Sequence, residues 1–251
     1  MISREVRDDV AIVQMQYGKV NALDTEFFRV LVAEFDELEQ MPVRSVVLCG
    51  SGNVYSAGVD LFRILNSGQD YIREFVPILA SGLERLFLFS KPLVAAVNGH
   101  AIAGGCIFAC ACDARLMADG TGRIGVPELL VGVPFPSVAM EIMRFVTPPQ
   151  FFQEIVYGAG TFLPKEALRL GLIDEVVPAD SLLKRAIEVA RKYGALPAQA
   201  FALTKKRIRQ PAMDRARLYP DLEEKIVKVW QSPETHAVIR NYLEVTLKPK
   251  A

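Results

Sequence analysis

The chain has 251 residues, 51% of them hydrophobic, and its 29 basic and 29 acidic side chains give a formal net charge of zero. This length supports one large domain, or one domain with a small appendage. A neutral chain has no general attraction for nucleic acid or for an acidic membrane surface, so we expect neither as a partner. Charges interrupt every apolar run well before the roughly 20 residues of a transmembrane helix, and residues 1–9 lack the apolar core of a signal peptide. A cytoplasmic protein is expected.

Apolar patterns and turn residues predict alternating strands and helices along most of the chain. Strands are expected at residues 10–15, 45–49, 92–97 and 114–117. Helices are expected at residues 26–40, 71–89, 138–145, 149–157 and 181–193, the last ended by Gly194 as a C-cap. Residues 163–177 form a predicted helix, a glycine stop and a strand, and the rest is helical in pattern and punctuated by proline. This alternation is typical of an α/β protein.

The four cysteines do not form the disulfide framework of a small secreted domain. Cys106, Cys110 and Cys112 lie close together, but neither His100 nor His236 stands at the spacing of a metal motif. We therefore expect buried free thiols and no metal site. Two histidines and the lack of a Gly-x-Ser-x-Gly segment also give no basis for a Ser-His-Asp triad.

Two glycine turns follow buried strands. The strand at 45–49 leads into residues 50–61, where the pair Ala57-Gly58 precedes Asp60-Leu61. The strand at 92–97 leads through the turn dipeptide Asn98-Gly99 to Gly104-Gly105, where a small, apolar helix begins. Paired glycines at a helix start leave N–H groups uncovered for an anion, or for an oxygen that becomes one. The alternative is a tight crossover in which glycine merely permits close packing.

Together these turns resemble the crotonase (enoyl-CoA hydratase/isomerase) superfamily. Residues 56–61 match its Ser/Ala-Ala-Gly-x-Asp-Leu turn, and its Lys-Pro-x-x-Ala-x-x-Asn-Gly-x-Ala-x-Gly-Gly run appears at residues 91–105, where Ala103 replaces the first glycine of the family's Gly-Gly-Gly-Cys. The likeness extends from about residue 10 to about residue 205. The resemblance implies that the N–H groups of Ala57 and Gly104 form an oxyanion hole for an acyl-CoA thioester. It also implies a set of substrate-binding residues, namely Ser56, Gly58, Val59, Asp60, Leu61, Gly105, Ile107, Val133 and Phe135.

The resemblance further implies a crotonase-like spiral of β-β-α units with a C-terminal helical region. Residues 1–195 would form the acyl-CoA-binding core, and residues 196–251 the helices that mediate oligomer contacts and cover the pocket. Members of the superfamily usually assemble as trimers or as hexamers of trimers. No cofactor is expected, because coenzyme A is part of the substrate.

Glu128 is the candidate general base. It is a carboxylate between apolar neighbours in the segment 125–132, which is how an acid/base group with a raised pKa looks in sequence. An ordinary glutamate at a sheet edge would look similar. The same Pro-Glu segment supplies one of the two glutamates of crotonase hydratases, and the resemblance therefore assigns catalysis to Glu128.

The second hydratase glutamate is missing. By the same resemblance its place is occupied by Ile107, and no acid lies between Glu128 and Glu141, where dienoyl-CoA isomerases carry an aspartate. A hydratase holds and activates its water with both carboxylates, so single-base chemistry fits better. The expected reaction is movement of a double bond from the 3 to the 2 position of enoyl-CoA. Hydratase, acyl-CoA hydrolase, carbon–carbon lyase and non-catalytic binding remain the alternatives.

Two further patterns have ordinary explanations. Residues 120–125 match a Gly-x-Gly-x-x-Gly dinucleotide fingerprint, but Pro127 follows where a helix should begin, so a turn between strands is expected. The basic run 205–209, with Arg215 and Arg217 beyond it, is read as a solvated helix face, with binding of coenzyme A phosphates or of RNA as alternatives. No aromatic residue interleaves with these bases, which argues against RNA.

Overall fold

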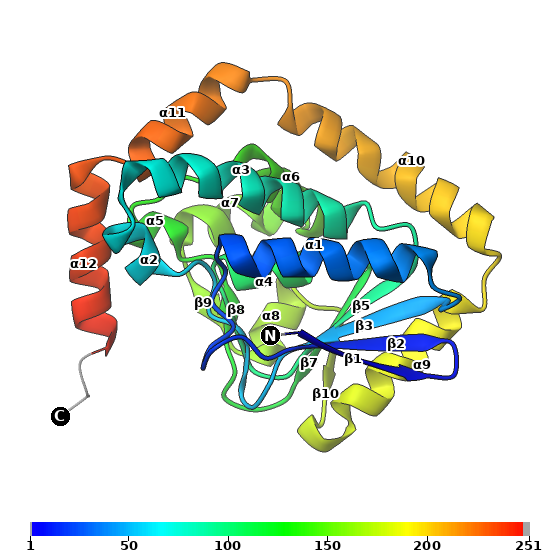
Figure 1. Ribbon diagram of the computed structural model, residues 1–251. Helices are drawn as coiled ribbons and strands as arrows, with labels where there is room; N and C mark the ends of the chain where they lie inside the picture. The colour runs from blue at the N-terminus through cyan, green and yellow to red at the C-terminus, as the bar shows by residue number, and fades with distance from the viewer. Residues whose placement is uncertain (1, 248–251) are drawn as a thin grey trace.

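The computed structural model describes residues 2–247 and contains two β-sheets surrounded by helices (Figure 1). The larger sheet has six strands in the order β1-β2-β3-β5-β7-β10, and the smaller has four in the order β4-β6-β8-β9. The strands are β1 Ile2–Arg7, β2 Val10–Met15, β3 Ser45–Cys49, β4 Val54–Ser56, β5 Leu93–Val97, β6 His100–Ile102, β7 Ala114–Ala118, β8 Ile124–Gly125, β9 Thr161–Phe162 and β10 Glu175–Val177. Within the described range, no helix is long and apolar enough to cross a membrane.

Helices cover both faces of the large sheet. The helices are α1 Thr25–Gln40, α2 Leu61–Asn66, α3 Gly68–Phe87, α4 Gly104–Cys110, α5 Glu128–Val131, α6 Ser137–Val146, α7 Pro149–Gly158, α8 Pro164–Arg169, α9 Leu182–Gly194, α10 Ala198–Ala216, α11 Pro220–Trp230 and α12 Pro233–Leu247, with a 3-10 turn at Ala179–Ser181. Side chains of α1, α3 and α4 share one core with the sheet, and those of α9 share a second core on its other face. Figure 1 shows α10, α11 and α12 running around the outside of the α1–α3 layer.

The chain repeats one path through both sheets. β3, β5 and β7 of the large sheet are followed by β4, β6 and β8 of the small one, and a helix comes next each time. Successive strands of this series are parallel neighbours in their sheets. Each turn of the chain thus adds one strand to each sheet and then a helix, which confirms the expected α/β spiral of β-β-α units.

The central strands are apolar throughout because both faces of the large sheet are covered. In β3, Val46 and Leu48 enter the core beneath α1 and α3, whereas Val47 and Cys49 face α9. This period of two is the geometry of a strand, in which successive side chains point to opposite faces. Because both faces of the strand are buried, the positions from Val46 to Cys49 are all apolar, and the sequence therefore shows a continuous apolar run.

The structure corrects two predictions about element ends and adds five strands that the apolar pattern did not locate, namely β1, β4, β6, β8 and β9. Residues 3–7 of the charged N-terminal segment are exposed and belong to β1, an edge strand antiparallel to β2. The helix expected at 71–89 is α3, which begins at Gly68 and ends at Phe87. Gly194 is the last residue of α9 rather than a left-handed C-cap, because Ala195 follows it with a φ of −70°. A Cβ on Gly194 would lie 3.2 Å from Ser45 Oγ, so glycine here permits close packing against the start of β3.

The basic run on α10 is divided between solvent and interior. Lys206 and Arg207 are exposed, as on a solvated face. Lys205 and Arg209 are buried and both pair with the Asp113 carboxylate, at 2.7 and 3.0 Å. Arg209 also donates to carbonyl groups at the C-terminal ends of α3 and α4, those of Phe87, Ala111 and Cys112. Cations are stabilised at helix C-termini, so this cluster fastens α10 to the core.

The cysteines and the dinucleotide-like segment have structural roles. All four cysteines are free and buried, as predicted. Residues 120–125 form the connection from β7 into β8, which confirms a turn between strands. In the part of the chain that the structure describes, no three His, Cys, Asp or Glu side chains gather in a group that could hold a metal ion.

Candidate active site

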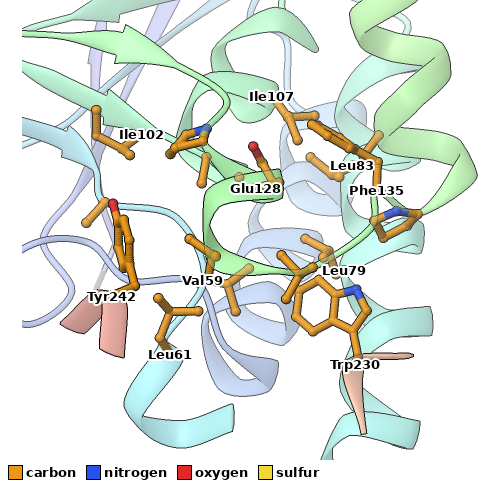
Figure 2. Close-up of a pocket in the computed structure, with 18 residues that line it drawn as sticks. Val59, Leu61, Leu79, Leu83, Ile102, Ile107, Glu128, Phe135, Trp230 and Tyr242 are labelled. Atoms are coloured by element: carbon orange, nitrogen blue, oxygen red, sulfur yellow. The ribbon is translucent and has the colours of Figure 1, made fainter. Parts of the chain in front are cut away.

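A pocket lies among α2, α3, α4, α5 and the C-terminal helices, with about 620 Å³ of empty space, part of it open to solvent (Figure 2). Around its mouth stand partly exposed residues, among them Ala57, Ile102 and Tyr242. Its inner end is formed by buried side chains, namely Leu79, Leu83, Ile107, Phe135, Ala139 and Trp230. A mostly apolar cleft with few polar groups is suited to a small-molecule ligand.

Glu128 is the first residue of α5, and its side chain projects into this apolar pocket. Its side chain is 7% exposed, and its Oε2 atom is buried without a hydrogen-bond partner among the described residues. Burial raises the pKa of Glu128 from 4.5 to about 8, because the charged form loses its hydration. Figure 2 shows the carboxyl group surrounded by apolar side chains. It is therefore poised to exchange a proton near neutral pH.

The first glycine turn presents the N–H group of Val59, not that of Ala57. The Ala57 N–H donates to the Val20 carbonyl, with 3.0 Å between N and O, so the expectation that it serves as an oxyanion donor is corrected. Val59 forms a parallel bridge with Leu23, and the bonds of that bridge are made by the flanking Gly58 carbonyl and Asp60 N–H. In a parallel bridge the central residue's own N–H points away from the partner strand. No acceptor is found for the Val59 N–H within residues 2–247.

The second glycine turn presents the N–H group of Gly104. Ala103 has a φ of +52°, and the first turn of α4 begins directly after it. The N–H groups of Cys106 and Ile107 both donate to the Ala103 carbonyl, whereas that of Gly104 has no acceptor in the described chain. The first N–H groups of a helix have no partner within it, so this donor is available to a ligand.

The two turns pack directly on each other. A Cβ on Gly58, whose φ is +83°, would lie 3.1 Å from the Gly104 nitrogen. A Cβ on Gly105 would lie 2.3 Å from the Ser56 carbonyl oxygen, which no side chain could tolerate. Glycine at these positions brings the Val59 and Gly104 backbones to the same side of the pocket. Both residues line the pocket together with Glu128.

The predicted site residues divide into two groups. Those that line the pocket are Ala57, Val59, Leu61, Gly104, Ile107, Glu128, Val133 and Phe135. Ser56, Gly58, Asp60 and Gly105 do not line it. The Ser56 hydroxyl donates to the Asn21 carbonyl and accepts from the Gly58 N–H, and Asp60 accepts the Arg63 N–H as the N-cap of α2. These polar side chains shape the turn rather than face the pocket.

Several residues that line the pocket were not among the predicted site residues. Leu79 and Leu83 come from α3, and Trp230 and Tyr242 come from α11 and α12. The leucines carried a detectable signal, since both lie on the apolar face of an amphipathic helix. Trp230 and Tyr242 carried no detectable sequence signal for a place in the pocket, except that Trp230 is the only tryptophan in the chain.

Fold and pocket together are those of a crotonase-type enzyme. The chain belongs to the enoyl-CoA hydratase/isomerase family, whose model matches residues 5–249. It is 30% identical to rat mitochondrial enoyl-CoA delta isomerase 1 over 217 residues, which is 85% of this chain and 75% of the relative. It is also 30% identical to the short-chain-enoyl-CoA hydratase of Clostridium acetobutylicum over 207 residues, covering 81% and 79% of the two chains.

The solved structure of human mitochondrial delta3-delta2-enoyl-CoA isomerase resembles this chain over its whole length. The TM-score is 0.94 at 26% identity, with 100% of this chain and 99% of the human chain covered. Relatives named as isomerases and as hydratases thus share this fold.

Proposed function

We propose that this protein is an enoyl-CoA isomerase that moves the double bond of a 3-enoyl-CoA to the 2 position, with Glu128 as its single acid/base. One observation carries the proposal: among the described residues that line the pocket, Glu128 is the only one with a carboxyl group. Ile107, where the resemblance to hydratases would place a second glutamate, is instead an apolar wall residue that is 3% exposed.

The site supplies both requirements of this reaction. Glu128 removes a proton from the alpha carbon of the thioester, and the electron pair moves toward the thioester oxygen to give a dienolate. The N–H groups of Val59 and Gly104 donate to that oxygen, and a preorganised donor of this kind contributes about 3 kcal/mol. Glu128 then returns the proton to the gamma carbon, so that no water is consumed.

The apolar surroundings of Glu128 favour this chemistry over hydration. A hydratase must use polar groups of the protein to hold a water molecule against the substrate. In this pocket the walls include the apolar side chains of Ile107, Val133 and Phe135. These side chains offer no hydrogen bond to a water molecule. They also strengthen the electrostatic contribution of the two backbone donors by excluding solvent.

We also propose the trimeric or hexameric assembly usual in the superfamily. Apolar side chains exposed on and just beyond α10, namely Leu203, Ile208 and Leu218, support it, since such contacts would cover them. Sedimentation equilibrium tests this, and a monomer at micromolar concentration would refute it.

Glu128→Gln tests the catalytic assignment. The amide keeps the shape of the carboxyl group but cannot accept the proton, so we expect kcat for isomerisation of a 3-enoyl-CoA to fall by a factor of about 10² to 10⁴. Binding of a saturated acyl-CoA, measured by isothermal titration calorimetry, should be retained because the pocket is unchanged in shape. Unchanged kcat in Glu128→Gln would remove Glu128 from the mechanism.

A further inference from the structure

The pocket has a direction that fixes where each part of an acyl-CoA would lie. Its partly exposed mouth is formed by residues such as Ala57 and Leu61, and its inner end is fully buried. In Figure 2, Glu128 and Val59 lie between the mouth residues Leu61 and Tyr242 and the inner residues Phe135 and Trp230. A charged coenzyme A moiety cannot enter a buried apolar end without losing hydration that nothing there replaces. The hydrocarbon chain must therefore point inward.

Trp230 closes the inner end of the pocket. It is the last residue of α11, is 2% exposed, and lies on the opposite side of the pocket from Tyr242 in Figure 2. Its indole Nε1–H donates to the Pro134 carbonyl at 2.9 Å, and its ring packs against Phe75 with centroids 6.3 Å apart. Both interactions limit the orientations that the indole ring can adopt.

The loop that follows Glu128 is tied to the C-terminal helices at three points. Besides the Trp230 bond, Glu223 accepts the Ser137 N–H at 2.9 Å, and the Thr235 hydroxyl donates to the Gly132 carbonyl at 3.3 Å. These bonds join α11 and the start of α12 to residues 132–137. Hydrogen bonds from α11 and from the start of α12 thus fix the position of Trp230, in addition to the packing of its ring.

Among the described residues, the side chains at the inner end also offer no free polar partner to a substrate. Its walls are the hydrocarbon side chains of Leu79, Leu83 and Ala139 with the aromatic rings of Phe135 and Trp230. Of these five side chains only the indole of Trp230 carries a polar hydrogen, and that N–H is already bonded to the Pro134 carbonyl. A hydroxyl or carboxylate at the far end of an acyl chain would be buried without a hydrogen bond, which is strongly unfavourable.

We propose that Trp230 is the specificity-determining residue for acyl length, and that it limits the substrate to short, unsubstituted hydrocarbon chains. This inference rests on the proposed function for the identity of the ligand. A chain longer than the pocket meets the indole ring, and the bond to Pro134 prevents the ring from turning aside. Removing the indole extends the pocket toward Phe75.

The test compares hexanoyl-CoA with decanoyl-CoA in binding, and the matching 3-enoyl-CoA substrates in kcat/KM, for the wild type and Trp230→Ala. We expect the wild type to favour the six-carbon chain, and the variant to raise the ten-carbon to six-carbon ratio by about tenfold or more in both measurements. Trp230→Leu removes the indole but keeps an apolar side chain, and it gives the same direction of change if Trp230→Ala does not fold. Val229→Ala, at a half-exposed position on the same helix, is the matched control and should leave the ratio unchanged.

The outcomes separate the two proposals. An unchanged chain-length ratio in folded Trp230 variants overturns the role of Trp230 and leaves the isomerase proposal standing. A shifted binding ratio without any isomerisation supports the role of Trp230 and refutes the proposed reaction. Failure of the wild type to bind either acyl-CoA overturns both. Tighter wild-type binding of an acyl group that ends in a carboxylate would overturn the claim about substrate class.

Discussion

Burial, rather than a charged neighbour, sets the proton affinity of Glu128. The side chain stands in an apolar pocket, one of its oxygens has no hydrogen-bond partner within residues 2–247, and loss of hydration raises its pKa to about 8. The form that removes a proton from substrate is the carboxylate, which is the minor form of the free enzyme at pH 7. The high proton affinity that makes Glu128 a strong base therefore also lowers the fraction of enzyme molecules in which Glu128 is ionised.

The pH dependence of the rate follows from that pKa. For the free enzyme, kcat/KM should rise about tenfold per pH unit below pH 8 and level off above it, because the ionised fraction of Glu128 rises in that way. Steady-state isomerase assays between pH 6 and 9 measure it. A profile that is flat from pH 6 to 8 would show that the working base has an ordinary carboxyl pKa.

The oxyanion donors show where residue-level prediction from sequence fails. The motif correctly located the two glycine turns, and Gly104 presents its N–H group as expected. Ala57 does not, because its N–H donates to the carbonyl of Val20, which lies far away in sequence. A contact of this kind leaves no pattern in the residues around Ala57, so the proposal that Val59 is the donor could be made only from the structure.

At the scale of elements, long strands and helices were predictable and short ones were not. The period of two in β3 and the apolar face of α1 repeat often enough to be recognised. The small sheet is built from strands of two or three residues, such as β8 and β9, which are too short to show any period. Yet these short strands carry the turns that form the site. The resemblance to a family supplied what the local pattern could not.

The proposed reaction requires close contact between α4 and β4, because that contact brings the two glycine turns together. Gly105→Ala would place a Cβ 2.3 Å from the Ser56 carbonyl oxygen and push the start of α4 away from the first glycine turn. We expect kcat to fall by about 10² or more, comparable to loss of an oxyanion donor, and the free energy of unfolding to fall by about 1–3 kcal/mol. Chemical denaturation and isomerase assays measure the two effects.

Gly158→Ala is the matched control for that substitution. A Cβ at Gly158, at the end of α7, would meet no atom within 4 Å, so neither activity nor stability should change appreciably. If Gly105→Ala retained the kcat of Gly158→Ala, close packing of the two turns would not be needed for the reaction.

At the scale of the whole molecule, the C-terminal helices were predictable as helices but not in position. Arg209 and Lys205 looked like part of a solvated basic face, and the structure instead pairs both with Asp113 in the interior. α11 and α12 follow α10 in the chain, and their residues Trp230 and Tyr242 line the pocket. The predicted division of function between residues 1–195 and residues 196–251 stays a prediction. The buried charges of Lys205 and Arg209 fasten α10 to the core.

The central claim is that one carboxylate in an apolar pocket shifts a double bond without consuming water. The most direct test is to measure kcat/KM of the wild type for 3-hexenoyl-CoA isomerisation and for 2-hexenoyl-CoA hydration under the same conditions. The single-base site predicts that isomerisation is faster by at least about 100-fold, the scale of one general acid–base contribution. A kcat for hydration, from the same assays, of ordinary enzymatic size, of order 10 per second, would contradict single-base isomerisation, since a second group would then have to activate the water.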